Sequence, residues 1–96
     1  MIGFHHHVAH ADTPHLGIRK GDRLCHVFSD LPDLGAAERE LRGWAQSNGP
    51  RGLRLQQRGQ RRQHYDLWGP WLAVCGPPAD RLTLRRWLRP HTTAYG

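Results

Sequence analysis

The apolar residues of 34–47 recur at the spacing of an α-helix, which is the clearest periodic pattern in the chain. The positions that fall on one face are Leu34, Ala37, Leu41, Trp44 and Ala45. Asp33 precedes them as a good N-cap, and a Gly-Pro pair at 49–50 follows as a stop signal. Glu38 and Arg42 face away at i,i+4, where opposite charges stabilise a helix. The pattern therefore predicts a helix over 34–47.

Alternation of apolar and polar residues predicts short strands on both sides of this helix. The segments concerned are 8–12, 23–30, 53–55 and 63–68. The pattern of 23–30 favours a buried strand but also fits the approach to a helix. Residues 13–22 contain Pro14, Gly17 and Gly21 and are typical of a loop. The alternation therefore predicts three to four strands.

The last part of the chain returns to helical spacing. We expect a second main helix over 79–90, with a basic face, and a short helical segment over 69–76. We expect 1–7 and 91–96 to be loose termini. A chain of 96 residues has room for one core. The expected fold is a small single α/β domain of the α+β type, with two main helices.

Charge is the most unusual property of the composition. Fourteen basic residues, thirteen of them arginine, oppose eight acidic ones, which gives a net charge of +6 and a pI of about 10.7. This balance favours a polyanionic partner such as nucleic acid, an acidic protein or an anionic membrane. The alternative is that a GC-rich genome favours arginine codons. The apolar runs are too short for a membrane span.

The cysteines and the first residues indicate the compartment. Cys25 and Cys75 are fifty residues apart and form no Cys-x-x-Cys motif, which excludes a zinc ribbon and a thioredoxin-type site. The N-terminal segment lacks the basic and apolar regions of a secretory signal. We therefore expect a cytoplasmic protein with reduced thiols, although a single disulfide stays open.

Histidine and aspartate recur at spacings that bring them to one side of an element. His64 and Asp66 share one face of the strand expected over 63–68, roughly 7 Å apart at Cβ. His26 and Asp30 share a side whether 26–30 is a strand or a helix turn. Asp12 is a third acidic position. Histidines also crowd the first twenty residues, where they fit either a metal-binding tract or a polar terminus.

The order of these motifs resembles a known group of small bacterial and phage proteins, the domain-of-unknown-function 4031 family. That family has a strand ending in Asp, a Trp-Cys-His-Leu-x-x-Asp motif, a helix with Glu-Leu-His-x-Phe-Ala, a Gln, and His-Tyr-Asp. The matching stretches here are Leu24-Cys25-His26-Val27-Phe28-Ser29-Asp30, Glu40-Leu41-Arg42-Gly43-Trp44-Ala45, Gln56 or Gln57, and His64-Tyr65-Asp66, with Asp12 near the family's first Asp. The resemblance covers roughly residues 8–76.

The chain also departs from the family pattern. Arg42 stands where the family has a helix histidine, which puts an imidazole role there in doubt, and Leu24 replaces the aromatic residue before Cys-His. The arginine-rich segment 51–62 and the basic helix 79–90 are outside the motif. The family supplies no established function, so the resemblance implies only that its His and Asp residues have a structural or chemical role and are not merely exposed to solvent.

Two roles fit the set His26, Asp30, His64 and Asp66, with Asp12 as a further ligand. The side chains could form a buried hydrogen-bond network that ties strands to the helix. They could instead form a catalytic acid–base site or bind a divalent metal, and such a mixed nitrogen and oxygen set suits Zn, Mn or Fe. A metal-bound water beside arginines would attack phosphate esters.

Arginines and tryptophans crowd the middle of the sequence. The residues concerned are Arg51, Arg54, Arg58, Arg61, Arg62, Trp68 and Trp71. Arginine forms bidentate phosphate contacts, and exposed aromatic rings stack on unpaired bases, a combination typical of RNA or single-stranded DNA binding. The alternative is that the tryptophans belong to the core and the arginines to a solvated edge.

The leading prediction is a nucleic-acid-associated protein with a His/Asp site, which could be a metal-dependent phosphodiesterase or a related hydrolase. The alternative is a non-catalytic basic binding module, such as a phage-type inhibitor or adaptor that docks an acidic protein or nucleic acid. Its His/Asp set would be purely structural. The chain lacks a nucleophile-elbow serine and a phosphate-binding glycine loop.

Overall fold

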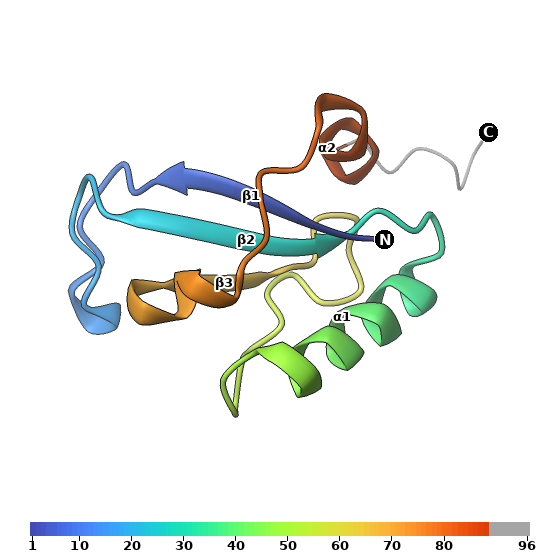
Figure 1. Cartoon of the computed structure of the whole chain (residues 1–96), viewed down its shortest axis with the longest axis horizontal. Helices are drawn as coiled ribbons and strands as arrows, with labels where there is room; N and C mark the ends of the chain where they lie inside the picture. The colour runs from blue at the N-terminus through green and yellow to red at the C-terminus, as the bar shows by residue number, and fades with distance from the viewer. Residues whose placement is uncertain (89–96) are drawn as a thin grey trace.

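Three antiparallel strands in the order β1-β2-β3 form the centre of the fold (Figure 1). The strands are β1 (Ile2–Val8), β2 (Arg23–Ser29) and β3 (Tyr65–Trp68). Helix α1 (Leu34–Asn48) covers one face of the sheet, and helix α2 (Arg81–Leu88) lies over the other. The structure is a computed structural model that describes residues 1–88. The predicted α+β domain with three to four strands and two main helices is confirmed.

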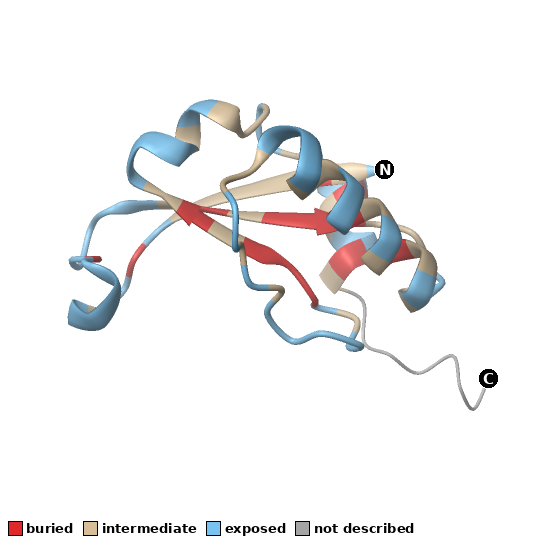
Figure 2. Ribbon diagram, turned by 90° about the horizontal axis from the view of Figure 1, so that it is seen from below, coloured by how far each residue is buried: buried red, intermediate tan, exposed pale blue. Residues whose placement is uncertain are grey.

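The register between the strands determines which side chains face α1. Val27 of β2 lies opposite Phe4 of β1 and Tyr65 of β3, so these three side chains share one face. The buried core on this face consists of Cys25, Val27, Leu41, Tyr65 and Leu67. Figure 2 shows the buried residues concentrated along β2, β3 and the inner side of α1. Within residues 1–88, no helix is long and apolar enough to cross a membrane.

Helix α1 forms where its sequence predicts. The Asp33 carboxylate accepts a hydrogen bond from the Ala36 backbone N–H at 2.8 Å, which satisfies one of the first free amides of the helix. Ala37 and Leu41 are buried on the side that faces the sheet. The Arg42 Nε donates to Glu38 at 2.8 Å on the exposed side.

The N-terminal segment differs from its prediction. The sequence pattern predicts a loose segment over 1–7 and a first strand over 8–12, but β1 occupies Ile2–Val8 and pairs with β2 over its full length. The reason is an alternation that the histidines disguise: Ile2 and Phe4 pack against the core, while His5 and His7 point to the other face of the sheet. Asp12 lies beyond the strand, where its carboxylate accepts from the Lys20 N–H at 2.7 Å.

Smaller differences concern the second half of the chain. The strand expected near 53–55 is reduced to one bridge between Gln56 and His64. Segment η2 (Gly69–Val74) is a 3₁₀ helix, as is η1 (Pro14–Leu16). The predicted end of the last helix at 89–90 and the expected loose terminus 91–96 lie outside the described residues. Cys25 and Cys75 are both free, so the structure contains no disulfide between them.

Candidate functional site

A row of polar side chains crosses the face of the sheet opposite α1. His5, His26 and Asp66 occupy adjacent strands at the same level, because the register pairs His5 with His26 and His26 with Asp66. His7 and His64 lie two residues from members of this row and point to the same side. The sheet register thus collects residues from three separate parts of the sequence on one surface.

Asp66 is the centre of the row. His26 Nδ1 donates to Asp66 Oδ1 at 2.5 Å, and His64 Nε2 lies 3.2 Å from the same oxygen. One ligand atom from each of these three residues lies within 4.8 Å of the others. The prediction that His64 and Asp66 share one side of their strand is confirmed. We call His26, His64 and Asp66 the His–Asp cluster.

The hydrogen bonds of His64 determine its charge. Its Nδ1 lies 2.6 Å from the Arg62 carbonyl oxygen, which can only accept, so Nδ1 carries a proton. A second proton on Nε2 is needed for a hydrogen bond to Asp66, and the ring then is a cation. Burial lowers the pKa of His64, but the bonds to Asp66 and to the Arg62 carbonyl outweigh it, and the pKa lies above its ordinary 6.5.

Asp66 is ionised in this arrangement. Burial opposes its charge and raises its pKa, whereas hydrogen bonds from His26 and His64, with their positive charge, lower it. The second effect is larger, and the pKa of Asp66 lies well below its ordinary 3.8. The carboxylate therefore stays negative throughout the neutral range and is available to a metal ion.

His7 extends the cluster and was not predicted as a site residue. Its Nε2 lies 2.7 Å from His26 Nε2, and the two rings stack with centroids 4.4 Å apart. The two facing nitrogens form a hydrogen bond when one ring donates and the other accepts. The signal for His7 was present in the alternation of residues 2–7, which puts His5 and His7 on the side opposite Ile2 and Phe4.

Trp87 of α2 closes one side of the cluster. Its ring centroid lies 5.8 Å from that of His64 and 6.0 Å from that of His26, and its face stacks on Phe28 at 4.5 Å. Trp87 is 3% exposed. Its indole Nε1 is buried and has no hydrogen-bond partner within residues 1–88.

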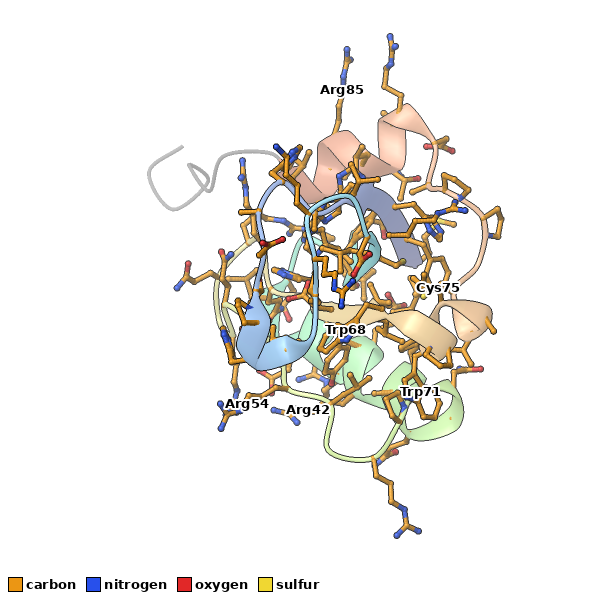
Figure 3. All side chains as sticks on the ribbon, turned by 90° about the vertical axis from the view of Figure 1, so that its left-hand side faces the viewer. Arg42, Arg54, Trp68, Trp71, Cys75 and Arg85 are labelled. Carbon is orange, nitrogen blue, oxygen red and sulfur yellow. The ribbon has the colours of Figure 1, made fainter. Side chains whose placement is uncertain are left out.

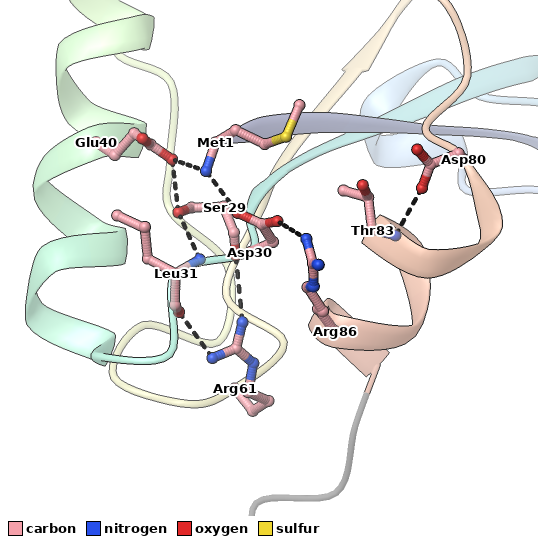
Figure 4. A network of polar contacts seen from close by, with 9 residues as sticks. All are labelled: Met1, Ser29, Asp30, Leu31, Glu40, Arg61, Asp80, Thr83 and Arg86. Carbon is pink, nitrogen blue, oxygen red and sulfur yellow. Dashed lines mark hydrogen bonds and ion pairs between the residues drawn. The ribbon is translucent and has the colours of Figure 1, made fainter.

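Asp30 and Asp12 do not belong to the cluster, so the structure does not bring these two carboxylates to the predicted metal site, and the catalytic role of Asp30 stays an untested prediction. Asp30 follows His26 by four residues of extended chain, so the two residues are about 13 Å apart. The Asp30 carboxylate instead bonds the Met1 amino group at 2.5 Å and Arg86 at 3.3 Å (Figure 4). Asp12 is held in the loop beyond β1.

The predicted basic residues fall into two groups. Arg51, Arg54 and Arg62 are exposed and form no ion pair with any residue of 1–88. Arg58 donates to Glu38 at 3.1 Å. Arg61 is half-buried and donates to the carbonyl oxygens of Leu31, Pro32, Ser29 and Trp87. Its guanidinium therefore ties backbone segments together, while its predicted role in phosphate binding stays a prediction.

The two predicted aromatic contacts differ in exposure. Trp71 is 46% exposed, whereas Trp68 is half-buried. Figure 3 shows both tryptophans on the side of the molecule that also carries Arg42 and Arg54. Trp68 and Trp71 line one pocket and Arg51 lines another, and Pro50 and Leu53 belong to both linings.

A comparison of the chain with protein families, curated proteins and solved structures finds no significant match. The resemblance to the domain-of-unknown-function 4031 family therefore stays a prediction, and the site must be interpreted from its own geometry.

Proposed function

We propose that this protein is a metal-dependent phosphodiesterase that acts on nucleic acid, with the His–Asp cluster as its metal centre. The observation that carries the proposal is the convergence of two imidazoles on one ionised carboxylate, within 4.8 Å, from strands distant in the sequence. Two nitrogen ligands and one oxygen ligand suit Zn, Mn or Fe and leave coordination positions for water and substrate.

One hydrogen bond of the cluster matches that of a metal-binding imidazole, and the remaining protons would have to leave. The Arg62 carbonyl fixes Nδ1–H of His64, the outer hydrogen bond that usually orients a metal-binding imidazole. A divalent ion would replace the protons on His26 Nδ1 and His64 Nε2 that now face Asp66. Binding would therefore release protons and strengthen as the pH rises.

A bound metal would require the ligand atoms to move. Two donor atoms about 2.1 Å from one tetrahedral ion are about 3.4 Å apart. His26 Nδ1 and Asp66 Oδ1 are 2.5 Å apart, so they would separate by roughly 0.9 Å. The ion would polarise a phosphate oxygen and lower the pKa of a bound water, and hydrolysis would give a phosphate monoester and an alcohol.

The test is metal binding and hydrolysis by the untagged protein. We expect calorimetry with Zn²⁺ or Mn²⁺ to give one high-affinity site, and the loaded protein to hydrolyse bis(p-nitrophenyl) phosphate. His26→Gln and His64→Gln should each lose at least about tenfold in affinity. His15→Gln, on the exposed η1, is the matched control and should bind as the wild type. Equal metal affinity in all three variants would place the metal elsewhere and overturn the proposal.

A second candidate is a non-catalytic basic module with a purely structural His–Asp network. The observation in its favour is that His64 is 7% exposed and both of its ring nitrogens already contact protein atoms. This candidate predicts a wild-type protein that binds no metal and variants that unfold at lower denaturant concentration. Its partner would be an acidic protein or nucleic acid that contacts the basic surface.

A further inference from the structure

Two adjoining pockets lie where the loop after α1 meets β3 and η2. The first has a volume of about 390 Å³ and is lined by Arg42, Gln46, Arg51 and Tyr65 among others. The second has a volume of about 350 Å³, and its lining includes Asp66, Leu67, Trp68 and Trp71. Both linings include Pro50 and Leu53, so the two pockets adjoin, and we call the two together the groove.

The first pocket has the chemistry of an anion site. Arg51 forms no ion pair with residues 1–88, and no acidic residue of that part of the chain lines the pocket. Arg42 binds Glu38 through Nε, which leaves both of its terminal nitrogens as donors. Arg58 shares the same carboxylate, so these three residues retain one net positive charge. Two guanidinium groups on one pocket match the geometry of a phosphate.

Tyr65 adds a neutral donor to the first pocket. Burial raises the pKa of Tyr65, so its hydroxyl keeps its proton at neutral pH. The hydroxyl forms no hydrogen bond with a described residue. A phosphate oxygen that enters the pocket would therefore meet a hydroxyl donor as well as two guanidinium groups.

The second pocket has the chemistry of a base-stacking site. Trp71 is 46% exposed, and Trp68 and Leu67 add further apolar surface. Exposed indole faces stack on unpaired bases, whereas the bases of a duplex already stack on each other. An acidic peptide would match the arginines but would leave the flat face of Trp71 without a partner of its own shape.

The edge of β3 adds backbone donors and acceptors to the second pocket. His64 exchanges two backbone hydrogen bonds with Gln56 on the side away from β2. Strand geometry alternates, so Asp66 and Trp68 also turn their N–H and C=O groups to that side. On the opposite edge of the sheet, the Ala79 N–H donates to the Phe4 carbonyl of β1 at 2.8 Å. The β3 edge lies beside the second pocket and offers backbone groups to the edge of a base there.

We propose that this groove binds single-stranded nucleic acid, with a backbone phosphate at Arg42 and Arg51 and an unpaired base against Trp68 and Trp71. The inference deepens the proposed function, because Asp66 both lines the second pocket and belongs to the His–Asp cluster. Cleavage of the bound strand rests on the proposed function, whereas binding of the strand does not. The two can therefore fail separately.

The experiment measures fluorescence anisotropy of labelled ten-nucleotide dT and rU oligomers and of a duplex, in EDTA so that no metal-dependent cleavage occurs. We expect both single strands to bind more tightly than the duplex. Trp71→Ala should weaken binding by roughly tenfold or more, and Trp71→Tyr should retain most of it. Arg51→Glu should weaken binding and make the slope of log affinity against log salt shallower by about 0.7 for each phosphate that the variant no longer neutralises.

Controls distinguish a site in the groove from general attraction by the positive charge. Arg85→Glu makes the same charge change on exposed α2 and should alter affinity by less than about threefold. The inference would be overturned by equal losses of affinity in Arg51→Glu and Arg85→Glu, or by a preference for the duplex. It would also be overturned if Trp71→Ala left the affinity unchanged, including the case in which polyglutamate displaces the strand. Single-strand binding by the wild-type protein in EDTA, with no hydrolysis once Zn²⁺ or Mn²⁺ is added, would overturn only the proposed function and would leave the inference intact.

Discussion

At the scale of single residues, Asp66 organises the polar face of the sheet. It accepts from His26 and faces a His64 ring that is held by the Arg62 carbonyl. Removal of its charge would leave a buried imidazolium without a counter-ion, which costs more than the net value of one hydrogen bond. The same carboxylate is the acidic ligand of the proposed metal centre, so its structural and chemical roles are coupled.

We predict that Asp66→Asn destabilises the metal-free protein by about 1–2 kcal/mol, a modest value because the partly exposed carboxylate is screened by solvent. Urea unfolding in EDTA at pH 6 measures this loss. Histidine NMR titration should show that the pKa of His64 falls toward 6.5 or below it. A His64 pKa unchanged by the substitution would contradict the assignment of Asp66 as its counter-ion.

The shifted pKa values of His64 and Asp66 make the stability of the protein depend on pH. The pKa of His64 is raised above 6.5, so its contribution is complete below pH 6.5 and is lost as the pH rises through the raised value. The pKa of Asp66 is lowered below 3.8, so its contribution is present above that pH and is lost on acidification. We expect the difference in unfolding free energy between wild type and Asp66→Asn, measured in EDTA, to be largest between about pH 4 and 6.5. A difference that grows above pH 8 would contradict this.

At the scale of elements, the packing of β1 and α2 beside the His–Asp cluster depends on one close contact. Gly3 of β1 lies against the Phe28 ring, and a Cβ built on Gly3 would come within 2.4 Å of it. Phe28 is fully buried and stacks on Trp87, so its ring has little room to move. The glycine therefore allows β1, β2 and α2 to pack together beside the His–Asp cluster.

We predict that Gly3→Ala lowers the free energy of unfolding by about 1–3 kcal/mol, because overpacking displaces the Phe28 ring. Gly43→Ala is the matched control, since Gly43 is exposed within α1 and its added Cβ would meet nothing within 4 Å. That variant should gain about 0.5–1 kcal/mol. Chemical denaturation of both proteins measures the two changes. If Gly3→Ala were as stable as Gly43→Ala, the packing described for Phe28 would be wrong.

At the scale of the whole molecule, the excess of arginine is divided between structure and surface. Arg61 ties its loop to the end of β2 and to α2 through backbone carbonyls, and Arg86 pairs with Asp30. The ion pairs of residues 1–88 include neither Arg51 nor Arg54. The unpaired positive charge of these two residues therefore lies near the groove, where it favours a polyanion.

We predict that a chain lacking residues 1–7 does not fold cooperatively, because the deletion removes nearly all of β1 and the ion pair between Met1 and Asp30. Far-ultraviolet circular dichroism with thermal melting tests this against the full chain. A truncated protein with the native spectrum and a sharp transition would show that β1 is dispensable. The N-terminal histidines should therefore be tested by substitution rather than by deletion.

Features that depend on local periodicity could be predicted from the amino-acid sequence. Helix α1, its Asp33 cap, the strand at 65–68 and the shared side of His64 and Asp66 all follow from repeats of 3.6 or 2 residues. The order of the chemical motifs also indicated that His26 belongs with His64. These predictions were correct because the direction of a side chain within one element is set by that element's own geometry.

The meeting of residues from different elements depended instead on the packing of the folded chain. The register of β1 and β3 on β2 brought His7 and Asp66 to His26, while extension of β2 carried Asp30 about 13 Å away. A shift of one residue would have turned His26 or Asp66 to the core face, and burial of the apolar side chains on that face forbids it. Register depends on packing across the whole sheet, which is why the composition of the site could be foreseen only in part.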